Sequence, residues 1–273
     1  PRGLAPVELE QLLSRQYFLN GLSGCTMGIL AQFVVDSMPL QPVPESFAGA
    51  LSGVLYYGGE TLSFDLSFAC LLIASLLVCF LWSENIWFGA KPPGDTEATA
   101  SEQWRIPEAL GRMGNDKLLL TIMVVSAATE SAMYAFVIEW TPALTLPSGE
   151  GPPHGLVFSC FMIAYMAGSI LFGLLAQLLS PAGMLIAFSS TSLLAVGGTF
   201  LAFHTGYAAT QTGIFVVFLL LTTFELGLGG YMAAIATLKA TYVPDDLRAT
   251  VYNLFRVPLN LIVVVINVVS LSS

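Results

Sequence analysis

The feature that most constrains this chain is a series of seven apolar runs, each long enough to cross a lipid bilayer. Crossing a hydrocarbon core of ~30 Å takes about 20 apolar residues in an α-helix, and a helix satisfies its own backbone hydrogen bonds within lipid. We therefore predict an all-α, polytopic membrane protein with seven transmembrane helices. The runs cover residues 16–35, 64–82, 118–143, 155–179, 184–203, 213–238 and a last stretch from 248 to the end.

The placement of charge agrees with this prediction. Only 10% of the residues are charged, whereas a soluble domain carries roughly 25%. If the seven runs alternate in direction, all nine Lys and Arg residues fall on one side, which the positive-inside rule assigns to the cytoplasm. We expect an integral protein of the plasma membrane with cytoplasmic basic loops, the lipid bilayer as partner, and no nucleic-acid binding. The nine are Arg2, Arg15, Lys91, Arg105, Arg112, Lys117, Lys239, Arg248 and Arg256.

The longest polar stretch, 83–117, divides the runs into two before it and five after it. Secondary transporters are commonly built as two six-helix halves joined by a cytoplasmic linker. We therefore interpret 1–82 as the last two helices of an N-terminal half and 118–273 as a C-terminal half lacking its last helix. Within the linker, 104–113 could form an amphipathic surface helix, and 36–63 is expected to be an irregular loop with a short surface helix.

One cation lies within the last apolar run. Counted at about 100° per residue, Asn253, Arg256, Asn260 and Asn267 share one helix face. A guanidinium matches tetrahedral oxyanions in bidentate fashion, so Arg256 with Asn253 and Asn260 is the first candidate for anion binding. Two alternatives stay open: a gate-locking ion pair with an aspartate at 245 or 246, or an arginine that anchors the helix at the membrane surface.

Two carboxylates lie about twelve residues into their runs, Glu130 and Glu225. An ionisable group at that depth is costly unless it faces a cavity or a partner. Each is therefore a candidate for carrying protons or facing substrate, the alternative being a structural hydrogen bond to a neighbouring helix. Gly227, Gly229 and Gly230 follow Glu225 and indicate either close helix packing or a bend.

Small residues predict where helices approach one another. Gly21, Gly24 and Gly28 would permit close contact along the first run. In the fourth run we interpret a stripe of small residues and methionines as packing; it comprises Ser159, Met162, Met166, Ser169 and Gly173.

No pattern indicates catalysis, a cofactor or a metal. The four cysteines all lie in apolar runs without metal-ligand spacing, and we expect buried thiols; they are Cys25, Cys70, Cys79 and Cys160. No nucleophile–base arrangement is visible either, so an enzyme is not expected.

Several short phrases resemble one family. They are SEN at 83–85, ES at 130–131, WTP at 140–142, FSCFM at 158–162 and NLFRVPL at 253–259. On these phrases the chain resembles the molybdate-anion transporter family of the major facilitator superfamily. The resemblance implies twelve helices, of which these seven would be helices 5–11.

The same resemblance implies the molybdate anion as substrate, and we expect its uptake by alternating access. Protons are a possible coupling ion, a hypothesis motivated by the carboxylates within the apolar runs alone. Transport of another anion or an organic solute, and a non-transporting membrane scaffold or sensor, are the alternatives.

Overall fold

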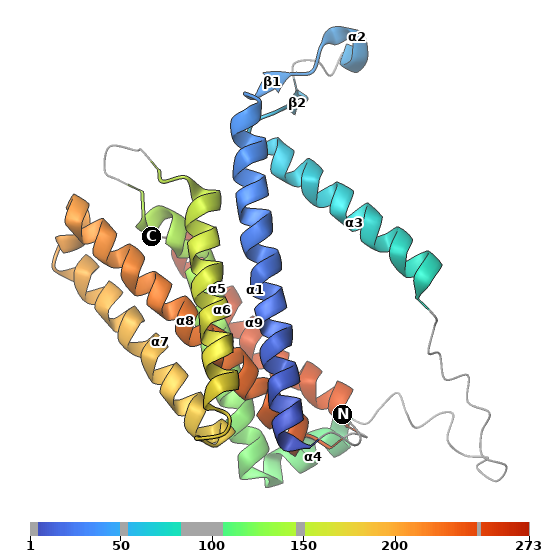
Figure 1. Cartoon of the computed structure of the whole chain (residues 1–273), viewed down its shortest axis with the longest axis vertical. Helices are drawn as coiled ribbons and strands as arrows, with labels where there is room; N and C mark the ends of the chain where they lie inside the picture. The colour runs from blue at the N-terminus through green and yellow to red at the C-terminus, as the bar shows by residue number, and fades with distance from the viewer. Residues whose placement is uncertain (1–4, 50–53, 83–105, 146–150, 245–246, 273) are drawn as a thin grey trace.

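The chain folds as a bundle of long helices in a computed structural model that describes residues 5–49, 54–82, 106–145, 151–244 and 247–272. Within these residues seven helices are long and apolar enough to cross a membrane, which confirms the predicted all-α membrane fold (Figure 1). They are α1 (Pro6–Ser37), α3 (Thr61–Leu81), α5 (Lys117–Ala143), α6 (His154–Leu175), α7 (Pro181–His204), α8 (Gln211–Tyr242) and α9 (Arg248–Ser272).

Polar residues set the points at which several of these helices begin. The Asp116 carboxylate accepts hydrogen bonds from the backbone N–H groups of Leu118 and Leu119 at the start of α5. Ser180 caps α7 by accepting from Gly183 N–H at 3.2 Å, and Thr210 caps α8 in the same way. Such caps satisfy donors that the first helical turn leaves open, so the apolar runs start at defined residues.

The short elements lie in the connections. The 36–63 connection contains the expected short helix, α2 (Glu45–Ala48). It also contains a two-stranded antiparallel sheet of β1 (Gln41–Pro42) and β2 (Tyr56–Tyr57), which was not predicted from the sequence. The 3₁₀ helix η3 (Tyr207–Ala209) precedes α8. The predicted amphipathic helix is present as α4 (Ile106–Asn115), with Ala109 and Met113 buried. The stretch 83–105 lies outside the described residues.

Helix α8 is the centre of the bundle. It packs against α6 and α7 and carries many of the fully buried side chains, among them Phe224, Leu228 and Tyr231. The ring of Phe224 stacks on Phe136 of α5 with ring centroids 5.2 Å apart. Aromatic contacts of this kind fix α5 and α6 against α8.

Helix α1 packs along the length of α6 (Figure 1). A Cβ at Gly21 would lie 2.6 Å from Met166 Cγ, and one at Gly24 would lie 2.9 Å from Met162 Sδ. At such distances a larger residue would displace the methionine side chains, so the glycines allow the helices to approach this closely. The predicted packing role is confirmed for the glycines of the first run and for the stripe of small residues and methionines in the fourth run.

Hydrogen bonds tie the same two helices together. Ser14 donates to the Ser169 carbonyl oxygen at 2.6 Å, and Ser159 donates to the Cys25 carbonyl at 3.0 Å. These bonds lie in the interior of the α1–α6 contact, where water is not available to replace them. The interface therefore combines close packing with satisfied polar groups.

Helix α3 stands away from the bundle and has no buried residue (Figure 1). Its Cys70 and Cys79, like Cys160 on α6, are exposed, and Cys25 alone of the four is buried. The prediction that all four thiols are buried was therefore wrong for three of them. An apolar side chain in a membrane helix can face lipid as well as protein, so apolarity does not predict burial.

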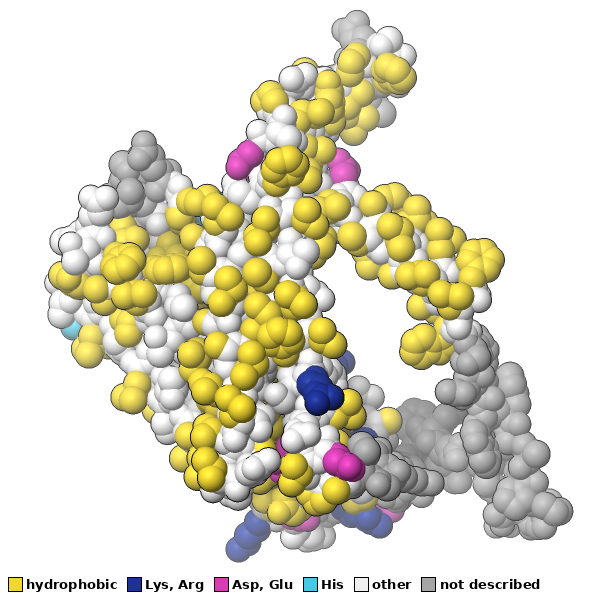
Figure 2. All heavy atoms as spheres, viewed as in Figure 1, with side chains coloured by type: hydrophobic (Ala, Val, Ile, Leu, Met, Phe, Trp, Pro, Cys, Tyr) yellow, Lys and Arg dark blue, Asp and Glu magenta, His cyan; other side chains and the backbone are white. Residues whose placement is uncertain are grey.

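The surface shows where charge gathers. Figure 2 shows a mostly hydrophobic middle, with Lys and Arg side chains toward the end of the bundle where α1 begins. Glu108 and Arg112 of α4 form an exposed ion pair of 3.8 Å at this end. On the face shown, the Lys and Arg side chains of the described residues therefore gather toward one end of the bundle.

Candidate functional site

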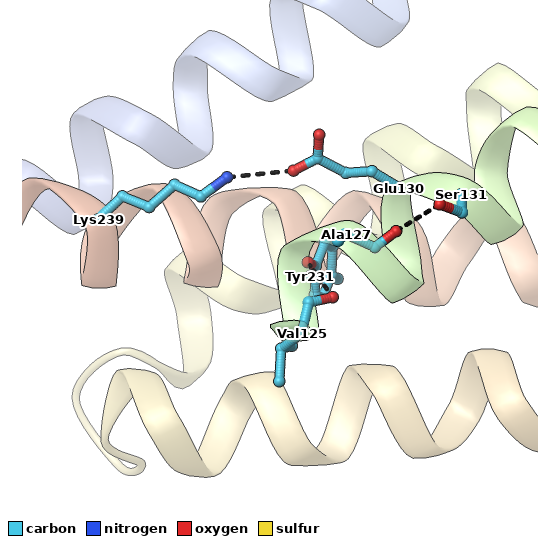
Figure 3. Close-up of polar contacts among 6 residues, drawn as sticks. All are labelled: Val125, Ala127, Glu130, Ser131, Tyr231 and Lys239. Atoms are coloured by element: carbon cyan, nitrogen blue, oxygen red, sulfur yellow. Dashed lines mark hydrogen bonds and ion pairs between the residues drawn. The ribbon is translucent and has the colours of Figure 1, made fainter. Parts of the chain in front are cut away.

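Glu130 lies near the middle of the 27-residue helix α5 and pairs with Lys239 of α8. The Lys239 Nζ and Glu130 Oε1 atoms are 3.1 Å apart, and 17% and 23% of the two side chains are exposed (Figure 3). The bond is both a hydrogen bond and an ion pair. A charge that would be costly alone in an apolar bundle is thereby compensated.

Helix geometry explains how two residues on different helices meet. Side chains lean toward the N-terminus of their own helix. Because α5 and α8 run in opposite directions (Figure 1), Glu130 and Lys239 lean toward each other along the bundle. Figure 3 shows the Lys239 side chain extended along α8 toward the carboxylate.

A third helix contributes to this site. Lys239 Nζ lies 5.6 Å from the centroid of the Phe255 ring on α9, within the range of a cation–π contact. The ion pair therefore lies where α5, α8 and α9 come together.

Hydrogen bonds fix the neighbouring part of α5. Tyr231 of α8 donates to the Val125 carbonyl at 3.3 Å, and Ser131 donates to the Ala127 carbonyl at 2.6 Å (Figure 3). The first bond crosses between helices and the second stays within α5. The bond from Tyr231 therefore joins α5 to α8 near the turn that carries Glu130.

Glu225 has a different environment from Glu130. Its side chain is only 3% exposed, and Oε2 has no hydrogen-bond partner among the described residues. No hydrogen bond or ion pair within the described chain joins it to Glu130 or Lys239. The two carboxyl groups occupy separate environments.

The glycines that follow Glu225 pack closely against two helices. A Cβ at Gly229 would overlap the Tyr165 carbonyl oxygen of α6, and one at Gly227 would overlap the Ser192 hydroxyl of α7. At Gly230 a Cβ would overlap the Phe188 ring. Of the two roles expected for these glycines, the structure provides direct evidence for close packing.

The polar stripe of α9 lies on its exposed side. Asn253, Arg256 and Asn260 are all exposed, whereas Val251, Phe255 and Leu259 form the buried face. Within the described chain no acidic side chain forms an ion pair with Arg256. The aspartates at 245 and 246, its suggested gate partners, lie outside the described residues.

Residues 1–224 match the model of a major facilitator family described as sugar transporters with 12 transmembrane segments. This match covers more than half of the 273 residues. The chain belongs to this family. It is therefore a polytopic membrane protein of a transporter family.

Curated relatives carry a more specific name. The chain is 35% identical to a molybdate-anion transporter of Takifugu rubripes over 164 residues, which covers 57% of this chain and 32% of that protein. It is 36% identical over 157 residues to one of Danio rerio, covering 54% and 30%. It is 31% identical over 196 residues to one of Xenopus tropicalis, covering 70% and 39%.

The chain thus spans about a third of the length of the curated relatives it matches. No solved structure matches it. The resemblance inferred from the short sequence phrases is confirmed at the level of the family and its relatives.

The pairing of Lys239 with Glu130 was not predicted from the sequence. Lys239 was assigned to the cytoplasmic connection because the apolar run ends at 238. Helix α8 continues to Tyr242, so Lys239 lies within the helix and its side chain reaches back into the bundle. A lysine within one turn of an apolar run, together with a mid-run glutamate, was the signal that could have suggested the pair.

Proposed function

We propose that this chain forms part of a secondary transporter that takes up the molybdate anion by alternating access. The observation that carries the proposal is its 35% identity to a molybdate-anion transporter over 164 residues. Membership in a transporter family and seven helices of membrane-spanning length support it. We further propose that the membrane is the plasma membrane and that the basic end of the bundle faces the cytoplasm.

The seven helices would correspond to helices 5–11 of twelve. In this arrangement α1 and α3 end an N-terminal half, 83–117 is the cytoplasmic linker, and α5–α9 belong to the C-terminal half. The close packing of α1 on α6 supports a contact between the halves at this seam. Alternating access would then move the halves about a site between them.

The proposed substrate-binding or gating residues are Arg256, Asn253, Asn260, Glu130 and Glu225. Arg256, Asn253 and Asn260 share the exposed face of α9. This shared face supports a role for them in binding the anion or in gating. The ion pair at Glu130 and the buried carboxyl group of Glu225 support the use of one of them in proton coupling. Unchanged uptake after the pH gradient is collapsed would contradict the coupling.

The experiment is molybdate uptake into proteoliposomes that contain the protein expressed from its complete coding sequence. We expect time-dependent, saturable molybdenum accumulation above that of empty liposomes. Competition by tungstate or sulfate would define the range of oxyanions. Accumulation no greater than in empty liposomes would contradict the proposal.

A second candidate substrate is a sugar or another organic solute. The description of the matching family as sugar transporters favours it. Uptake of labelled sugars in the same proteoliposomes, with molybdate as competitor, separates the two candidates. A protein that accumulates neither solute would favour the non-transporting scaffold or sensor.

A further inference from the structure

We propose that Lys239 is an anion-binding group of this transporter. In this proposal the Glu130 carboxylate is its counter-ion and pairs with the lysine when no anion is bound. The inference rests on the proposed function and names the cation that contacts its substrate. It concerns an ion pair between α5 and α8 that lies within the apolar part of the bundle.

The first argument is the hydrogen-bonding capacity of the lysine. An ammonium group has three donors. Within the described chain Lys239 uses one of them, in the bond of 3.1 Å to Glu130 Oε1, while the Phe255 ring covers it at 5.6 Å. The ammonium group therefore retains donors for the oxygens of a second anion.

The second argument concerns charge compensation during exchange. A largely buried lysine needs an anionic partner at every stage of a transport cycle. If an oxyanion replaces the Glu130 carboxylate at Nζ, the lysine remains compensated throughout. Because 23% of the Glu130 side chain is exposed, water can solvate the released carboxylate.

The third argument is the position of the pair at a junction of helices. Lys239 is held by α8, its carboxylate partner by α5 and its aromatic partner by α9. An anion that enters between these helices would change contacts on all of them at once. Anion binding at Lys239 could therefore alter how the helices are arranged.

A purely structural ion pair makes a different prediction, and a double variant separates the two. When a structural pair is broken, removal of either partner is harmful and removal of both restores function, because no charge is left uncompensated. When Lys239 binds the anion, Glu130→Gln removes the competitor and leaves the lysine uncompensated until an anion binds. The neutral double variant then does not recover the original KM. The pairwise comparison therefore tests the role of the lysine itself.

The experiment compares the complete protein with Lys239→Gln, Lys239→Arg, Glu130→Gln and the double variant Lys239→Gln/Glu130→Gln. Arg112→Gln, which removes a basic residue from the exposed α4 ion pair, is the matched control. The readouts are the KM for molybdate uptake and the rise in Tm of the purified protein on adding molybdate. Because a ligand stabilises the state that binds it, the second readout reports binding without transport.

We expect Lys239→Gln and the double variant to raise the KM at least tenfold and to lose the molybdate-dependent rise in Tm. Lys239→Arg should retain saturable binding. Glu130→Gln should show a larger molybdate-dependent rise in Tm than the unaltered protein. The control Arg112→Gln should show the same KM and the same rise in Tm as the unaltered protein. A double variant with the original KM, or Lys239→Gln with an unchanged KM and rise in Tm, would overturn the proposal.

Failure of the proposed function has a separate signature. If the unaltered protein takes up no molybdate, the transport proposal fails, and the Tm measurement is repeated with tungstate, sulfate and phosphate. A rise in Tm that depends on Lys239 would then still support anion binding. Absence of any oxyanion-dependent rise in the unaltered protein would overturn the inference.

Discussion

Glu130 and Glu225 show how the surroundings of a residue decide its role. Both lie well inside apolar runs, so their sequence positions are equivalent. In the folded chain, Glu130 is paired with Lys239 at 3.1 Å, whereas Glu225 is 3% exposed with Oε2 unbonded among the described residues. The charge of Glu130 is compensated by a cation, whereas a charge on Glu225 would be buried without one and would therefore be costly.

The first prediction concerns Glu225. Replacing Glu225 by Met keeps a similar volume and removes a buried oxygen that lacks a partner. Leaving such a group unsatisfied costs about 1–3 kcal/mol, so we expect Glu225→Met to keep or raise the Tm of the detergent-solubilised protein. Thermal unfolding followed by fluorescence size exclusion measures this, and a fall in Tm of several degrees would show that the carboxyl group has a stabilising partner.

Arg256 allows a second prediction at the same scale. If its guanidinium contacts the transported anion, Arg256→Ala should lower kcat/KM for molybdate uptake by about tenfold, corresponding to ~1.4 kcal/mol for a hydrogen bond to a charged group. Val257→Ala is the matched control, because Val257 is the next residue, 62% exposed and uncharged. Equal uptake by both variants would remove Arg256 from the candidate site.

Among the helices, the close contacts of α8 depend on glycines, which have no Cβ atom. Gly227, Gly229 and Gly230 let α6 and α7 approach the α8 backbone so closely that a Cβ would overlap their atoms. The approach is reciprocal at Gly168 of α6, where a Cβ would overlap the Leu226 carbonyl oxygen. Without a hydrophobic driving force between helices in lipid, such close packing is a main source of association.

The third prediction tests this packing. Gly229→Ala places a methyl group against a carbonyl of the α6 backbone, which cannot move aside as a side chain can, so we expect destabilisation of about 1–3 kcal/mol. Gly197→Ala on α7 is the control, because nothing lies within 4 Å of its added Cβ. In a helix interior that change stabilises by roughly 0.5–1 kcal/mol. Equal Tm values for the two variants would contradict the close approach of α6 and α8.

In the whole molecule, the described chain has one extended helix interface, between α1 and α6, and one helix, α3, that stands apart. Helix α1 is held to α6 by glycines, methionines and two serine hydrogen bonds. Helix α3, which follows α1 in the sequence, stands away from the bundle (Figure 1). If the halves move in transport, the α1–α6 seam is where that movement must be accommodated.

The fourth prediction is that a cross-link at this seam stops transport. Ser14 Cβ lies 3.2 Å from the position of a Cβ at Gly173, close to the ~3.5–4.5 Å found in disulfides. In a variant whose native cysteines are replaced by serine, Ser14→Cys with Gly173→Cys should form a disulfide on oxidation and lose uptake, and reduction should restore it.

Ser14→Cys with Gly197→Cys is the control pair, since Gly197 of α7 has no neighbour within 4 Å of its added Cβ. Cross-linking is followed by the mobility of protease fragments before and after reduction. Full uptake by the cross-linked Ser14/Gly173 variant would contradict movement between α1 and α6.

The amino-acid pattern alone was enough to predict seven membrane-spanning helices, all found within the described residues, and the places where glycines permit close helix contact. Apolar length decides whether a segment can cross a bilayer, and glycine at helical spacing permits contact, so both properties are local. The common face of Asn253, Arg256 and Asn260 is local for the same reason. The small sheet of β1 and β2 was missed because strands of two residues carry no periodic signal.

Only the tertiary structure decided which partner each helix takes and what compensates each buried charge. Glu130 and Lys239 are 109 residues apart in the sequence, and their meeting depends on α5 and α8 lying antiparallel in one bundle. Three cysteines face outward because the membrane solvates apolar side chains as well as the protein core does. Pairing across helices is a long-range property, and no pattern within one segment specifies it.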